Sequence, residues 1–345
     1  MKRLLWIFAA FVLGVLCSCS KEEVSLQSDD MISLAPVMGE DDVPTRASLY
    51  KSENELRADL FHTYVYFAET STRYFSSDAI YSTKDVDPTK HRWLFYEPSN
   101  DAYNNYYWPF VESLDFFAYA PVNNGYVEMN YQNNPPSFTA TMPLTNTGSA
   151  AVHQDTMKEF MYAYVPDQNK STGTVPLVFR HPFAAIVFKV QQSHRDLTVK
   201  TITVNDIEYK GTCSFARDAS SVPVWSGTAT GDMQLSIDKI IPGQVNFGGE
   251  LGGPYLVLPQ DNSSTDAKKK AVVLKFKWEK GKPDDNWTPA GEDKTYTITG
   301  KISNDWTAGK IYTYTVDLGN SREEILFEVS VTDWDYVYEH VFEIE

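Results

Sequence analysis

The chain has 345 residues, of which 42% are hydrophobic and 14% aromatic, and its formal net charge is −16. This length suffices for two ordinary domains, and the hydrophobic content excludes a chain that is disordered throughout. A surface with this excess of acidic groups repels the phosphates of nucleic acids, so we expect no nucleic-acid partner. The same charge argues against attachment to anionic lipid by electrostatics alone.

The N-terminus predicts export and lipidation. A short basic start is followed by an apolar run of 13 residues, from Leu4 to Leu16. This run has the length of a signal-peptide core, whereas a membrane-spanning helix needs about 20 residues. The residues that end it, Leu16, Ser18 and Cys19, resemble a lipobox. We therefore expect residues 1–18 to be a lipoprotein signal peptide and Cys19 to be acylated.

Acyl chains on Cys19, palmitate among them, would anchor the protein durably, since each buried CH₂ contributes about 0.8 kcal/mol. The next residues, Ser20 to Glu23, resemble the Lys-acidic signal that sends lipoproteins of Bacteroides-type bacteria to the outer face of the outer membrane. The alternative is an ordinary cleaved signal peptide with incidental cysteines. Once Cys19 is acylated, only Cys213 stays unmodified in the mature chain, so we expect no disulfide.

Strands dominate the rest of the chain. Residues 19–46 are acidic and predict a tether with one strand at 32–37, and Ser52 with Glu55 predicts a short helix that reaches Leu60. Alternating or continuous apolar runs predict further strands at 61–68, 93–96, 114–120, 161–165, 175–179, 183–190, 272–278, 295–302, 312–316, 325–331 and 338–344. Many short strands without helices between them indicate β-sandwiches. A polar stretch at 191–196 predicts a boundary between two domains, 47–192 and 193–345.

No catalytic motif emerges. The histidines show neither an HExxH motif nor an i, i+4 metal spacing, there is no G-x-S-x-G elbow, and the glycine pairs lack the rest of a P-loop. The acidic pairs near 284 and 292 resemble a Ca²⁺ loop only loosely, and a hairpin tip explains them better. We therefore expect no enzyme, no metal and no cofactor, although a carboxylate pair assembled by the fold stays open.

A cluster of aromatic and polar residues suggests one binding role. Tyr106, Tyr107 and Trp108 follow Tyr103 and two asparagines. Exposed aromatic rings of this kind hold the apolar faces of sugars, so glycan contact through Tyr106, Tyr107 and Trp108 is one hypothesis. A hydrophobic strand edge is the simpler interpretation.

Seven further stretches follow the lipobox: VPTRA at 43–47, LDFFAYAP at 114–121, FMYA at 160–163, LVFRHPFAAI at 177–186, YLVLPQ at 255–260, WTAGKIY at 306–312 and VSVTDW at 329–334. In this order they resemble the fimbrillin family, the Mfa-like or FimA-like fimbrial lipoproteins of Bacteroides-type bacteria. The resemblance implies an all-β protein with two tandem transthyretin-like Greek-key β-sandwich domains. It also implies a surface-exposed fimbrial subunit of the outer membrane that contributes to adhesion.

In such fimbrillins an arginine-specific protease removes the lipidated segment with its first strand, and a terminal strand of another subunit fills the groove. The matching bond here joins Arg46 to Ala47, so residues 19–46 would be lost. The candidate donor strand carries Tyr338, Phe342 and Ile344 on one face, unless this strand completes its own domain. The expected partners are fimbrial subunits of the same type, the outer membrane through the lipid, and a receptor on a host or bacterial surface.

Overall fold

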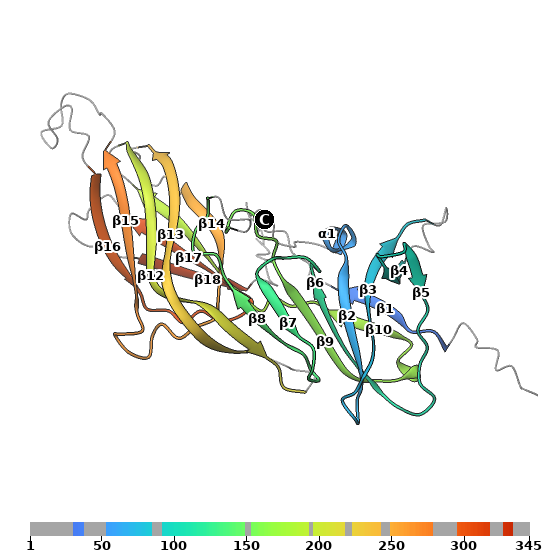
Figure 1. The fold of residues 1–345 in the computed structure, drawn as a ribbon. Coiled ribbons are helices and arrows are strands. Elements are labelled where there is room, and N and C mark those ends of the chain that lie inside the picture. The colour runs from blue at the N-terminus through green and yellow to red at the C-terminus, as the bar shows by residue number, and fades with distance from the viewer. Residues whose placement is uncertain are drawn as a thin grey trace, which may run out of the picture.

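Strands make up almost all of the regular structure in the computed structural model, which describes residues 30–37, 53–84, 92–148, 153–192, 196–217, 223–242, 249–278, 295–317 and 327–333. Between the strands of these segments lie the short helix α1 (Glu53–Arg57) and the 3-10 turn η3 (Lys170–Thr172). The prediction of an all-β fold is confirmed. The strands form an elongated body with a sandwich at each end (Figure 1).

The N-terminal sandwich is built on a sheet with the strand order β5-β4-β3-β2-β6-β9, in which all neighbours are antiparallel. Its strands are β2 (Phe61–Phe67), β3 (Arg73–Ser82), β4 (Arg92–Glu97), β5 (Ala102–Asn104), β6 (Leu114–Ala120) and β9 (Met161–Gln168). A parallel pair, β1 (Ser33–Val37) and β10 (Thr174–Val178), covers one face of this sheet. Between the layers lies the N-terminal core, which contains Phe61, Phe116 and Leu177.

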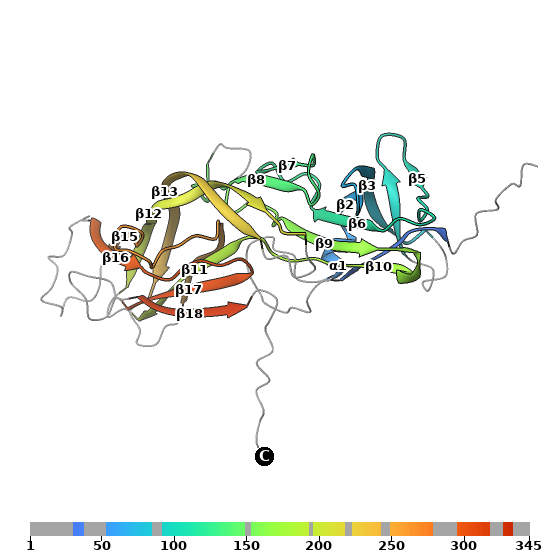
Figure 2. The same cartoon turned by 90° about the horizontal axis from the view of Figure 1, so that it is seen from below.

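The C-terminal sandwich packs the sheet β14-β11-β17-β18 against a sheet of order β16-β15-β12-β8-β7, in which β13 also pairs with β12 (Figure 2). Their bounds are β7 (Val127–Asn130), β8 (Ser137–Thr141), β11 (Ala184–Gln192), β12 (Leu197–Ser214), β13 (Val224–Ile241), β14 (Gly249–Val257), β15 (Lys270–Trp278), β16 (Thr295–Ile302), β17 (Lys310–Asp317) and β18 (Phe327–Asp333). The C-terminal core between the two sheets contains Phe188, Leu274 and Tyr314.

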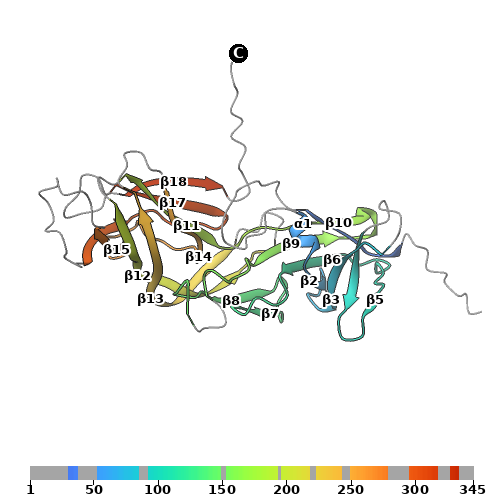
Figure 3. The same cartoon turned by 90° about the horizontal axis from the view of Figure 1, so that it is seen from above.

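A third group of buried side chains, the central core, joins the two sandwiches. Successive residues of β6 point to opposite faces of their sheet, so that Phe116 enters the N-terminal core and Phe117 the central core. The β7–β8 hairpin brings Phe138 into the central core, where its ring lies 5.5 Å from that of Trp225. Figure 3 shows β7 and β8 bridging the space between the sandwiches. The sheet of β2, β6 and β9 is therefore covered on both faces.

The strand pairings bear on the predicted domain boundary. Two transthyretin-like domains that meet between residues 192 and 193 stay a prediction. However, β11, which ends at Gln192, is hydrogen-bonded to β14 and β17 of the C-terminal sandwich. The polar stretch at 191–196 therefore follows a strand of that sandwich and leads to β12 in its other sheet. A loop between two layers of one sandwich is as polar as an interdomain linker, so composition alone does not separate the two.

Most of the predicted elements are confirmed. The strand expected at 32–37 is β1, and the short helix is α1, which ends at Arg57. The strands expected from 61–68 to 325–331 correspond to β2, β4, β6, β9, β10, β11, β15, β16, β17 and β18. The strand predicted at 338–344 lies outside the described residues.

Candidate functional site

The first strand, β1, lies in a groove of the N-terminal sandwich. It runs parallel to β10 over five residue pairs, from Ser33 opposite Thr174 to Val37 opposite Val178. The side chains at its start alternate: Ile32, which directly precedes β1, and Leu34 are only 4% and 7% exposed and belong to the N-terminal core, whereas Ser33 faces solvent. This period of two lets one short strand cover apolar side chains of β10 and the opposing sheet.

The other wall of the groove is the segment after β5. The backbone N–H of Ile32 donates to the carbonyl oxygen of Tyr106 at 2.8 Å, and the N–H of Trp108 donates to that of Asp30 at 2.9 Å. Asp30 also forms an ion pair with Lys170 of η3. The start of β1 is therefore held between two segments that are far apart in the sequence.

The structure places the three residues of the glycan hypothesis in this wall. Trp108 is 7% exposed, and its ring lies 5.8 Å from Phe116 in the N-terminal core. Tyr106 stacks on Phe75 with centroids 3.7 Å apart. The carbonyl of Tyr107 accepts a hydrogen bond from the hydroxyl of Tyr74.

Trp108 is therefore buried and not exposed as the glycan hypothesis requires, whereas Tyr106 and Tyr107 are half-buried. The rings of Tyr106 and Trp108 turn inward, because the core beneath them offers more apolar contact than solvent does. The simpler interpretation as a hydrophobic strand edge fits their positions. Glycan contact itself stays untested.

The other predicted site residues lie outside the described residues. They are Cys19, Arg46, Ala47, Tyr338, Phe342 and Ile344. The chain order alone places Arg46 and Ala47 between β1 and α1.

Sequence reasoning missed the residues that make the groove. The apolar run at 175–179 predicts β10 as a strand, but it does not predict the partner of that strand. Parallel pairing between strands some 140 positions apart leaves no local signature, unlike the turn of a hairpin. For the Tyr106–Trp108 wall, the sequence offers one signal, the run of aromatic residues. That run is equally consistent with buried rings and with rings exposed to solvent.

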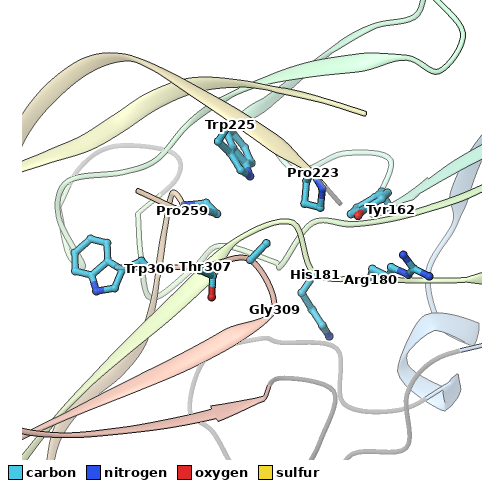
Figure 4. A pocket seen from close by; sticks show the side chains of 10 residues that line it. Tyr162, Arg180, His181, Pro223, Trp225, Pro259, Trp306, Thr307 and Gly309 are labelled. Carbon is cyan, nitrogen blue, oxygen red and sulfur yellow. The ribbon is translucent and has the colours of Figure 1, made fainter. Parts of the chain in front are cut away.

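A pocket of about 370 Å³ lies where the central core meets the C-terminal core (Figure 4). Tyr162, Trp225 and Trp306 provide aromatic walls, and Arg180 is exposed beside them. The indole N–H of Trp306 donates to the hydroxyl of Tyr314 at 2.7 Å, and burial raises the pKa of that tyrosine. These side chains are anchored by both cores, so the pocket is part of the join between the sandwiches.

His181 lines the pocket, and its Nδ1 pairs with the carboxylate of Glu159; both side chains are buried. In the part of the chain that the structure describes, no three His, Cys, Asp or Glu side chains gather as a metal site requires. Within the same segments, no helix has the length and apolar character to span a membrane.

The fold and the groove define the class of this protein. It is an all-β protein whose first strand, β1, completes a sandwich by pairing in parallel with β10. The chain belongs to the fimbrillin-like family, whose model matches residues 45–334. This confirms the resemblance on which the sequence-based expectations depend. The family is one of structural fimbrial proteins. No curated protein matches the chain.

Solved structures show the same fold. A fimbrial protein from Bacteroides vulgatus is similar with a TM-score of 0.59 at 14% identity, over 88% of this chain and 99% of that one. A candidate cell adhesion protein from Bacteroides uniformis is similar with a TM-score of 0.51 at 15% identity, over 89% of this chain and 99% of that one. At such identities the likeness concerns the fold.

Proposed function

We propose that this protein is a surface-exposed lipoprotein of the outer membrane that serves as a fimbrial subunit in adhesion. Its anchor is Cys19, its partners are subunits of the same type, and its role is structural, not enzymatic. Membership of the fimbrillin-like family supports the fimbrial role. The lipid anchor is supported by the lipobox pattern that ends at Cys19.

The observation that carries the proposal is the seating of β1. Leu34 of β1 and Ile32, the residue directly before it, are buried in the N-terminal core. Burial of two such side chains stabilises the strand by about 3–6 kcal/mol, in addition to its main-chain hydrogen bonds. Loss of β1 would leave an apolar groove beside β10, and another strand with the same alternation would fill it.

The connectivity of β1 makes such an exchange feasible. Among the described residues, β1 is hydrogen-bonded to β10 and its start to the Tyr106–Trp108 segment, and no tight hairpin ties it to β2. We propose that proteolysis between Arg46 and Ala47 separates the strand from the body. A terminal strand that carries Tyr338, Phe342 and Ile344, donated by a neighbouring subunit, would then replace it.

The test is limited digestion of the purified precursor with an arginine-specific protease. We expect one early cut after Arg46, identified by mass spectrometry, followed by concentration-dependent oligomers on mild heating. The matched control is Arg46→Lys, which keeps the charge but should resist this protease. Resistance of the unaltered chain at Arg46, or a clean cut that yields only monomers, would contradict assembly by strand exchange.

A further inference from the structure

The connection between β5 and β6 presents two adjacent apolar side chains to solvent. Phe110 is 101% exposed and Val111 is 88% exposed, more than any other large apolar residue in the described segments. Exposure of a Phe and a Val side by side costs solvation free energy that the fold does not recover. Such a feature is typical of a surface that contacts an apolar partner.

The two side chains project from a fixed base. On one side of them Trp108 is buried, and on the other side Leu114 is buried. The carbonyl of Ser113 also accepts a hydrogen bond from the N–H of Ala68 at 2.9 Å. Phe110 and Val111 therefore keep their exposed position without local unfolding.

This base adjoins the point where the N-terminal segment joins the body. The N–H of Trp108 donates to the carbonyl of Asp30 at 2.9 Å, and Figure 1 shows the β5–β6 connection and the start of β1 at the same end of the molecule. Cys19 precedes Asp30 by 11 positions, which span at most about 40 Å. A lipid on Cys19 would therefore hold this end close to a membrane surface.

We propose that Phe110 and Val111 insert into the lipid bilayer beside the acyl anchor and so fix the orientation of the uncut precursor on the membrane. The inference rests on the proposed lipidation of Cys19. Burial of these side chains among acyl chains supplies a second attachment, which a lipid-anchored protein needs for a defined orientation. The neighbouring Glu112 favours a bilayer surface of low net charge over an anionic one.

The test uses the chain from Cys19 to Glu345, coupled through the Cys19 thiol to a maleimide lipid in phosphatidylcholine vesicles with brominated acyl chains. Cys213 is buried, and burial raises its pKa, so it should not compete for the maleimide. The probe is Phe110→Trp. The matched control is Ile240→Trp, at an exposed apolar position on β13 in the C-terminal sandwich.

We expect the additional emission of Phe110→Trp to fall by about half against non-brominated vesicles, because the indole would reach acyl-chain depth. The emission of Ile240→Trp should not change. Equal emission of Phe110→Trp in both vesicles would overturn the proposal. So would concentration-dependent dimers in vesicle-free buffer that Phe110→Ser abolishes, since the side chains would then contact a second copy of the chain.

Failure of this inference is distinguishable from failure of the proposed function. Chemical coupling replaces acylation and requires no cut at Arg46, so the vesicles report on Phe110 alone. Acylation in cells is measured separately, as the mass of the N-terminal peptide from the unaltered chain and from Cys19→Ser.

Discussion

Asp115 shows how one charged residue is accommodated inside the protein. It lies within the buried strand β6, and its side chain is fully buried. Its carboxylate accepts hydrogen bonds from Nε of Arg217 at 2.7 Å, from Nδ2 of Asn134 at 2.7 Å and from the backbone N–H of Asp167 at 2.8 Å. Arg217 and Asn134 come from two separate loops and Asp167 from the end of β9, so the carboxylate holds three distant segments together.

Substitution of this carboxylate should therefore be costly. We expect Asp115→Asn to lower the free energy of unfolding by about 2–3 kcal/mol. The amide group of Asn would place its own N–H donors next to the N–H donors that now bind the carboxylate, and hydrogen bonds would be lost. The control is Asp167→Asn, since the exposed carboxylate of Asp167 contacts the same Arg217 and exposed pairs contribute about 0–1 kcal/mol. Urea denaturation measures both variants. An equal loss of unfolding free energy in the two variants would show that the burial of Asp115 does not determine its contribution to stability.

At the scale of elements, β1 offers the sharpest prediction. After a cut at Arg46, the strand should remain bound through its buried side chains. We expect Leu34→Ala to weaken this retention by about 2–3 kcal/mol, which makes release about 30- to 150-fold easier. Ser33→Ala, on the exposed side of the same strand, should release the fragment as slowly as the unaltered chain.

The measurement is co-elution of the N-terminal fragment with the body in size-exclusion chromatography after digestion. Oligomers should also form faster with Leu34→Ala, if vacancy of the groove limits assembly. Retention that is the same in both variants would mean that main-chain hydrogen bonds alone hold β1.

Strands with a continuous apolar run or a regular alternation of apolar residues can be predicted from the sequence. Strands in which this pattern is interrupted cannot. The two longest strands, β12 and β13, were missed. Register shifts between Val199 and Thr201 and between Val204 and Ile207 break the period of two in β12. In β13 most side chains are exposed or half-buried, so its composition is polar. Local patterns could predict β1 and β10 as strands, but only the fold shows that they form a groove.

At the scale of the whole molecule, aromatic burial predicts a response to alkaline pH. Burial raises the pKa of these tyrosines above the usual value near 10: Tyr64, Tyr66, Tyr119, Tyr164, Tyr255 and Tyr314. The folded state therefore keeps protons that the unfolded state loses above pH 10. The stabilisation is complete below pH 10 and is lost as the pH rises, by up to about 1.4 kcal/mol per pH unit for each group.

Absorbance at 295 nm, followed together with circular dichroism, measures this response. We expect the buried tyrosines to ionise in one cooperative step that coincides with unfolding. Gradual ionisation of all tyrosines near pH 10, with the β-sheet signal in circular dichroism unchanged, would contradict this prediction.

The central core has a mechanical consequence. In this core, Phe117 of β6 and Phe138 of β8 contribute aromatic side chains from the two sandwiches to one layer. Tension along the long axis of the molecule would have to shear that layer, because its rings come from β6 of one sandwich and from β8, which pairs with β12, of the other. A filament of such subunits would transmit a pulling force with little extension, unlike a string of domains on flexible linkers.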